Sequence, residues 1–477
     1  MKKLYCIMIC GLTGIFTAFA QAEATDSVWS ITGESVVTET AAAQSVSVVT
    51  VDAETMPAPD QPGATEAVAA ETEVYAAKEM NEPTQRFKAR AFSMHMGFTV
   101  AATAANNMIS IPDIFKPELV IDLNKLSKST MKSGLHAGGL FNFTLFSQFT
   151  VLGEHTIRFS TTVDANGWAN LSKSLVDLFA KGNAEIASGK TIDGTFNAKL
   201  TAFADTGIAY RLKKPSYGFY ARLAYFIPLA YMENPGGTYS VSPKKSGDVI
   251  DGMTINAEGT ADIYGYLPIR VLGGSMGNSG VADMFKRGGL DLSLEGAFRP
   301  AAWITVKGGI DYMPLMIVTM NKGIRGHFKY EGTLDNLLNT LGEGKSPFTQ
   351  NTVTDMNVAD LPTKKIMRPC KLRLGGDFRP LQNDYLILSP FLAFPVINAK
   401  PYYVDGGLKV ESRFAGVLGA YFDTGCIERI WRHELCFFVD SRWCTFQLAA
   451  SVASHDFKRT FTSLSGVGLK LGICIGF

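Results

Sequence analysis

The last stretch of the chain, Gly466 to Phe477, constrains the fold more than any other part of the sequence. Large apolar residues alternate there with small or charged residues, and the alternation continues to the final position. The apolar set comprises Val467, Leu469, Leu471, Ile473, Ile475 and Phe477, and the other set comprises Gly468, Lys470, Gly472, Cys474 and Gly476. A period of two residues predicts a β-strand with two unlike faces. Such a strand fits either a soluble sheet or the wall of a membrane barrel.

The first residues of the chain predict export. Lys2 and Lys3 precede an apolar run from Leu4 to Phe19, and small residues follow it. This order is typical of a secretory signal peptide, so we expect residues 1–22 to be removed.

Residues 23–86 differ in composition from the rest of the chain. Ala, Thr, Val, Glu and Pro dominate, acidic residues outnumber basic ones, and aromatic residues are nearly absent. Such a segment buries too little apolar surface to order itself. We therefore expect a disordered acidic periplasmic segment, followed by one folded domain over residues 87–477.

Several segments of the expected domain carry charged or polar residues on one face of an alternating pattern and apolar residues on the other. In Ala302–Tyr312, for example, Ile304, Val306, Ile310 and Tyr312 alternate with the polar set. Recurring charges suit a water-filled lumen better than a buried core, while the apolar face suits lipid. The candidate lumen residues are Asp291, Ser293, Glu295, Thr305, Lys307, Asp311, Lys371, Arg373, Asp377 and Arg379. Aromatic residues near strand ends, including Phe298, Trp303, Tyr312 and Phe378, are candidates for the interfacial girdle.

Short turns that contain a basic residue and proline mark three expected hairpins, at Pro215, Pro300 and Pro380. Bacterial barrels keep short turns on the periplasmic side, so we expect these turns and the C-terminus at one end. Met232–Arg287 and Asn321–Met367 are then long connections at the other end, holding either no strands or pairs of strands. The same parity requires the stretch from 402 to 422 to divide into two strands, near Ser412–Arg413.

The sequence offers no run of about eighteen apolar residues after the signal peptide, hence no transmembrane helix. A chain that spans a membrane without helices must close into a barrel, because lipid satisfies no backbone hydrogen bond. We therefore predict an all-β fold, a transmembrane antiparallel up-and-down β-barrel of about 14 strands, with about 12 to 16 as the range.

These features together resemble the outer-membrane β-barrel proteins of diderm bacteria over about residues 87–477. The resemblance implies a location in the cell outer membrane, contact with outer-membrane lipid, and recognition of Phe477 by the barrel-assembly machinery as an assembly signal. The expected strand number is similar to that of the fatty-acid-transporter type, although no plug motif of that type matches residue by residue.

Two functions fit this fold. The first is a channel or transporter for an unknown small molecule, with the candidate lumen residues lining the path. Their mixed signs argue against strong ion selectivity, and salt-bridged packing inside a closed barrel is the alternative reading of the same charges. The second function is a surface adhesin or interaction protein that uses the two long connections.

Other kinds of chemistry have little support. The net charge of +1 argues against a nucleic-acid partner. Gly273–Gly277 matches the nucleophile-elbow pattern without the strand, helix and βαβ context of a hydrolase, so we expect no enzyme. No spacing of histidines or cysteines predicts a metal or cofactor. The sequence leaves open whether two of Cys426, Cys436 and Cys444 form a disulfide bridge. The other cysteines of the mature chain are Cys370 and Cys474.

Overall fold

A computed structural model describes most of the chain between residues 92 and 476. The described residues are 92–107, 134–174, 176–177, 189–232, 236–246, 249–265, 286–335, 348–383, 385–397, 404–414, 417–427, 429–441, 443–462 and 465–476. The signal peptide, the acidic segment, Gly273–Gly277 and Phe477 lie outside them, so the predictions made for these parts stay predictions.

The described residues form β-strands almost throughout. The strands are β1 (Phe92–Asn106), β2 (Leu135–Val151), β3 (His155–Leu171), β4 (Ile192–Lys213), β5 (Tyr217–Met232), β6 (Gly236–Ser246), β7 (Val249–Tyr264), β8 (Gly289–Ala301), β9 (Ile304–Met316), β10 (Val318–Asp335), β11 (Phe348–Ile366), β12 (Cys370–Phe378), β13 (Ile387–Ile397), β14 (Asp405–Phe414), β15 (Leu418–Ile427), β16 (Ile430–Asp440), β17 (Cys444–Ser454) and β18 (Gly466–Gly476). A short helix, α10 (Phe457–Thr462), precedes β18. Among the described residues, no helix is long and apolar enough to cross a membrane.

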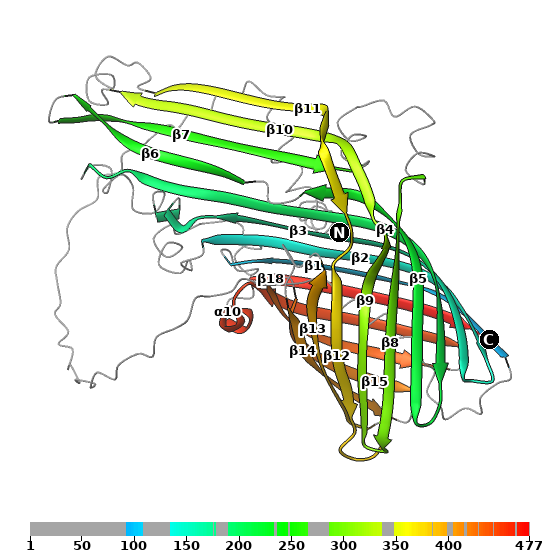
Figure 1. Cartoon of the computed structure of the whole chain (residues 1–477). Helices are drawn as coiled ribbons and strands as arrows, with labels where there is room; N and C mark the ends of the chain where they lie inside the picture. Colours follow the sequence, from blue (N-terminus) through cyan, green and yellow to red (C-terminus); the bar gives the residue numbers. More distant parts are fainter. Residues whose placement is uncertain are drawn as a thin grey trace, which may run out of the picture. The chain divides into compact units, whose positions relative to one another are not determined.

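The strands close into an antiparallel barrel (Figure 1). β1 pairs with β18, with Met96 opposite Ile475, and this pairing joins the first strand to the last. Around the ring, neighbouring strands pair in chain order except where β5 pairs with β8 and β9 pairs with β12. The strands β6, β7, β10 and β11, which lie between these positions in the chain, add the pairs β4–β6, β5–β7 and β7–β10. Closure satisfies the backbone groups of both edge strands, which an open sheet leaves unpaired. The predicted all-β antiparallel closed barrel is confirmed.

The predicted number of strands was too low. The sheet contains 18 strands in the described part of the chain. The difference comes from the two long connections, each of which holds a pair of strands, β6–β7 and β10–β11, one of the two alternatives left open for them. β6 pairs with the first residues of β4, β7 pairs with β10, and β11 pairs with β10. These four strands extend one wall of the sheet away from the short turns (Figure 1).

The barrel carries apolar side chains outside and charged side chains inside. On β18, Leu469 is 59% exposed whereas the adjacent Lys470 is 3% exposed. β12 repeats this arrangement, with Leu374 at 49% and Arg373 at 3%. A soluble protein would show the reverse, because the hydrophobic effect removes apolar surface from water. The alternation predicted from the sequence therefore describes the wall correctly.

The short turns lie at one end of the barrel, as predicted. Strands β4, β8 and β12 run toward that end, because each is followed there by a short turn and an antiparallel partner. β18 runs to the same end, because its last residues pair with the start of β1, which pairs with the end of β2 next to the β2–β3 turn that is hydrogen-bonded to Lys213. The backbone N–H of Arg299 donates to the carbonyl of Ser216, and that of Arg379 donates to the carbonyl of Trp303, tying neighbouring turns together. The stretch from 402 to 422 divides as parity required, although β14 continues to Phe414, beyond the expected break.

One predicted face was wrong. The period of two placed Tyr312 on the lipid side and in the aromatic girdle, but Tyr312 is 9% exposed. Its φ of 53° interrupts the extended backbone, and the pairing of β8 with β9 shifts register between Leu292 and Leu294. Such a bulge places two successive residues on the same side of a strand. Asp311 and Tyr312 are accordingly both buried.

Candidate functional site

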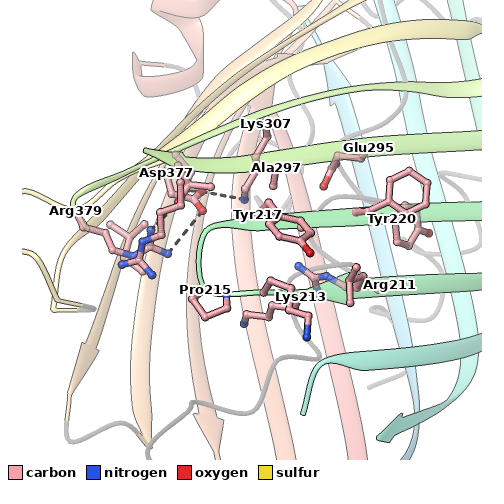
Figure 2. Close-up of a pocket in the computed structure, with 18 of the residues that line it drawn as sticks. Arg211, Lys213, Pro215, Tyr217, Tyr220, Glu295, Ala297, Lys307, Asp377 and Arg379 are labelled. Atoms are coloured by element: carbon pink, nitrogen blue, oxygen red, sulfur yellow. Dashed lines mark hydrogen bonds and ion pairs between the residues drawn. The ribbon is translucent and has the colours of Figure 1, made fainter. Parts of the chain in front are cut away.

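A pocket of about 200 Å³ opens inside the barrel at the end that carries the short turns. Its walls come from β4, β5, β8, β9, β12, β13 and β14 and from the turn between β4 and β5. Figure 2 shows side chains from several of these strands converging on the same space, among them Arg211, Tyr220, Lys307 and Arg379. The turns bring these residues together because each hairpin returns the chain to the same rim.

Basic side chains outnumber acidic ones in this pocket. The eight basic side chains are Arg211, Lys213, Lys214, Arg299, Lys307, Arg379, Lys409 and Arg413. The three acidic side chains are Glu295, Asp377 and Glu411. We call this site the basic pocket. Walls that carry mostly one sign of charge focus the electric field in the space between them and attract counter-ions.

Asp377 is shared between two cations of the basic pocket. The Nζ of Lys307 donates to Oδ1 of Asp377 at 3.0 Å, and Nη2 of Arg379 lies 3.7 Å from Oδ2. Ser389 also donates to Oδ1 of Asp377, at 2.9 Å. The hairpins β8–β9 and β12–β13 position these groups through the pairing of β9 with β12.

Glu411 has the same arrangement on β14. Lys409 and Arg413 lie two residues before and after it, so the alternation of the strand places all three on one face. Lys409 donates to Glu411 at 2.9 Å and Nε of Arg413 donates at 2.6 Å. At the turn between β4 and β5, Lys214 forms an ion pair with Glu154, and this hydrogen bond raises the pKa of the Lys214 amine.

An ionic cluster lies inside the barrel beyond the basic pocket, against β4, β5 and β8. Arg368 lies on the connection between β11 and β12 and is 2% exposed. It binds Asp291 of β8 with two hydrogen bonds, Nε to Oδ2 at 2.8 Å and Nη2 to Oδ1 at 3.1 Å. Its Nη1 donates to Asp205 of β4, which also accepts from Arg222 of β5. We call Arg368, Asp205, Asp291 and Arg222 the central cluster.

The central cluster lies next to the basic pocket along the strands. Arg222 is two residues beyond Tyr220, a pocket residue, and points to the same side of β5. Two residues of a strand span about 7 Å. The central cluster therefore lies next to the pocket, on the side away from the short turns.

Apolar and aromatic side chains surround the central cluster. The Arg368 guanidinium lies 3.9 Å from the centre of the Tyr312 ring and 5.4 Å from that of Phe226. Phe226 in turn packs edge-to-face on Phe203, within a buried group that includes Ile366. Buried charges persist in such surroundings only where each finds partners. The two carboxylates and two guanidiniums satisfy this requirement together.

The opposite wall carries a second buried polar group. The Tyr421 hydroxyl donates to Oε1 of Glu434 at 2.7 Å and accepts from Gln447 at 2.7 Å. Lys470 lies 3.4 Å from the same hydroxyl. This group joins β15, β16, β17 and β18 on the inner face of the barrel.

The predicted lumen residues occupy two places. Glu295, Thr305, Lys307, Asp377 and Arg379 line the basic pocket. The others are buried deeper, where Arg373 pairs with Asp311 at 2.7 Å and Lys371 with Asp405 at 2.8 Å. Asp291 belongs to the central cluster, and Ser293 accepts a hydrogen bond from the Tyr312 backbone N–H at 3.1 Å. Whether these residues line a path for solute stays a prediction.

Sequence reasoning did not select several charged residues of the basic pocket and of the barrel interior. The alternation of Arg432 and Glu434 on β16 and of Lys409, Glu411 and Arg413 on β14 carried the same signal as the residues chosen. Arg368 offered no such signal, because it belongs to a connection rather than to an alternating strand. The five described cysteines are free thiols, so the structure contains none of the bridges left open above.

Comparison with protein-family models finds no match, and comparison with curated proteins finds none either. Solved structures with a similar fold include the toluene transporter TbuX of Ralstonia pickettii, with a TM-score of 0.37 and 10% identity over 86% of this chain and 94% of TbuX. A FadL homologue of Pseudomonas aeruginosa has a TM-score of 0.34 and 8% identity, over 81% of this chain and 90% of its own.

The translocator domain of the autotransporter NalP from Neisseria meningitidis is also similar, with a TM-score of 0.28 and 8% identity. That likeness covers 85% of this chain and 94% of the translocator domain. All three likenesses are weak, and the function is inferred below from the residues of this chain.

Proposed function

We propose that this chain is an outer-membrane barrel that transports a small molecule through its interior. The supporting observation is the continuity between the basic pocket at the turn end and the charged interior above it. In this proposal the basic pocket is the periplasmic mouth of the path, and the central cluster closes the path at rest.

The exterior of the barrel supports a membrane location. Leu469, Phe437 and Ile475 are each more than half exposed on the outer face. At the turn end, Trp303 and Phe378 contact each other edge-to-face with ring centres 5.5 Å apart, and both are exposed. Aromatic residues of this kind favour the boundary between lipid and water. An apolar outer wall with aromatic residues at its end fits a bilayer better than water.

A closed resting state follows from the packing of the interior. Arg368, Asp291, Lys371 and Arg373 are each at most 3% exposed, and each has a partner of opposite charge. Side chains packed and paired in this way leave little room for water around them. Transport therefore requires the central cluster to separate, which distinguishes this barrel from a permanently open pore.

Single-channel conductance of the refolded chain in a planar bilayer tests the proposal. We expect the wild-type barrel to carry little steady current, and Arg368→Ala to carry more because the side chain across the interior is gone. A third variant, Arg368→Ala with Asp205→Asn and Asp291→Asn, removes the carboxylates that the first change leaves unpaired. Ion selectivity should then move toward cations when Lys307→Glu and Arg373→Glu are added.

Two results would contradict the proposal. Silence from all Arg368 variants, with folding verified by circular dichroism and by heat-modifiable gel migration, argues against a transport path. A wild-type barrel that conducts steadily, with no change on Arg368→Ala, argues against closure by the central cluster.

The alternative function, a surface interaction protein, draws on a separate observation. The strands β6, β7, β10 and β11 extend one wall of the barrel at the end opposite the short turns. Their arrangement offers an extended sheet on the side expected to face the exterior. A folded barrel that stays silent in every Arg368 variant would favour this function.

A further inference from the structure

We propose that the basic pocket binds a small soluble organic anion that carries two or more carboxylate or phosphate groups. The inference rests on the proposed function and deepens it, because it assigns a substrate class to the mouth of the path. It also revises the expectation of weak ion selectivity, which came from a list of residues that contained about as many acids as bases.

The charge of the basic pocket is the first observation. Eight basic side chains face three acidic ones, which leaves an excess of five positive charges. Lys214 also pairs with Glu154, and Nη1 of Arg413 lies 3.7 Å from Oδ2 of Asp440, so two carboxylates outside the lining lower this excess to three. A cation would be repelled here, whereas an anion gains from every wall of the pocket.

The geometry of the donors is the second observation. Four of the basic residues are arginines, namely Arg211, Arg299, Arg379 and Arg413. A guanidinium presents a planar fork of N–H donors that matches the oxygens of a carboxylate or phosphate. Arginines on four different elements surround the pocket, so one ligand with several anionic groups can contact more than one of them. A monovalent anion offers only one such contact.

The shape of the pocket is the third observation. A volume of about 200 Å³ suits a small metabolite and excludes a macromolecule. The central cluster lies on the inner side of the pocket, so a ligand entering from the turn end meets it there. Because the surrounding barrel wall has a low dielectric constant, the attraction between ligand and guanidinium is screened less than in bulk water.

Isothermal titration calorimetry of the whole refolded chain in a zwitterionic detergent tests the inference. Citrate and inorganic pyrophosphate are the probes for the carboxylate and phosphate classes, and acetate is the monovalent control. We expect saturable binding of at least one polyvalent probe, one per chain, that weakens about tenfold or more between low and high salt. Acetate should bind at least about tenfold more weakly than the better probe.

Variants locate the binding. Arg211→Gln should weaken the binding of the better probe about tenfold, since it removes one charge-assisted contact. Arg413→Gln should act in the same direction. Arg325→Gln is the matched control, because Arg325 lies on β10 outside the pocket and pairs with Asp262. Binding that is absent for both probes, or that Arg325→Gln weakens as much as Arg211→Gln, would overturn the inference.

The same proteins separate this inference from the proposed function. Citrate or pyrophosphate binding without current in any Arg368 variant keeps the anion site and removes the transport path. Current in Arg368→Ala that neither probe alters, together with no binding by calorimetry, keeps the path and removes the anion site.

Discussion

The Arg368 guanidinium lies 3.9 Å from the centre of the Tyr312 ring, while its N–H groups bind Asp291 and Asp205. Neither partner in this stack follows from the alternation of the strands. Tyr312 reaches the interior through a bulge, and Arg368 enters from a connection. A cation–π contact of this kind contributes about 0.5–2 kcal/mol. The stack and the two carboxylates together hold the β11–β12 connection inside the barrel.

Replacement of Arg368 should destabilise the barrel. Arg368→Met leaves Asp205 and Asp291 buried with fewer cations, and breaking a buried ion pair in this way costs about 3–5 kcal/mol. Unfolding in denaturant, followed by tryptophan fluorescence, measures the change in free energy. Adding Asp205→Asn and Asp291→Asn to Arg368→Met should recover part of the loss. An Arg368→Met protein as stable as the wild type would contradict the role given to the central cluster.

The backbone at Tyr312 should tolerate few residues. Its φ of 53° is costly for a β-branched side chain, so backbone strain in Tyr312→Ile should lower the free energy of unfolding by about 1–3 kcal/mol. Loss of the contact between the ring and Arg368 should add to this decrease. Tyr312→Phe keeps both the conformation and the ring, and should change stability little. Phe378→Ile is the control, because Phe378 is an exposed aromatic residue on a regular strand. Equal effects of the two isoleucine variants would count against strain at Tyr312.

A charge placed on the outer face should oppose insertion. Leu469→Arg exposes a guanidinium where Leu469 is 59% exposed on β18, and such a change costs about 2–4 kcal/mol near the middle of a bilayer. Folding into phosphatidylcholine vesicles, read from heat-modifiable migration, measures the effect. Leu469→Met should fold like the wild type. If Leu469→Arg also folds with unchanged stability, the outer face does not meet lipid.

Acidification should weaken the rim opposite the short turns through His455. This residue follows β17, and burial together with the neighbouring His136 lowers the pKa of its imidazole to about 3. The folded state therefore holds the ring neutral, whereas the unfolded chain takes up a proton near its ordinary pKa of about 6.5. Stability contributed by the neutral ring is present above about pH 6.5 and is lost as the pH falls toward 3.

Unfolding free energies at pH 8 and pH 5 measure this effect. The expected loss from His455 at pH 5 is at most about 2 kcal/mol, which is the linkage value for a shift of this direction and size. His455→Gln should be less sensitive to this change of pH than the wild type. An identical pH dependence in both proteins would exclude His455 as the titrating group.

The sequence predicted the strand pattern and the ends of the barrel well because both depend on local rules. Alternation on β18 and β12 reports which face meets lipid, since neighbouring side chains of a strand point to opposite sides. Proline and basic residues at Pro215, Pro300 and Pro380 marked the short turns, because proline cannot donate to the sheet. The direction of each strand then followed from the number of strands between one short turn and the next.

The sequence left open whether the long connections hold the hairpins β6–β7 and β10–β11, and whether the inner charges pair with one another. In the long connections, the pairing of β7 with β10 joins residues far apart in the chain, and no local pattern announces such a pairing. The face of Tyr312 was wrong because a bulge breaks the period on which the prediction depended. The candidate lumen residues were identified without their partners, such as Asp405 for Lys371, because each partner lies on another strand.

By itself the sequence determined that this chain forms an amphipathic β-barrel, with polar residues on one face of each strand and short turns at one end. Only the tertiary structure decided that most of the charges of that inner face pair with one another, that Arg368 joins them from a connection, and that the unbalanced charge gathers at the turn end. The physical reason is the separation along the chain over which each feature is set. The direction of a side chain is set by the residues next to it, whereas the partner of a buried charge is set by how distant strands meet.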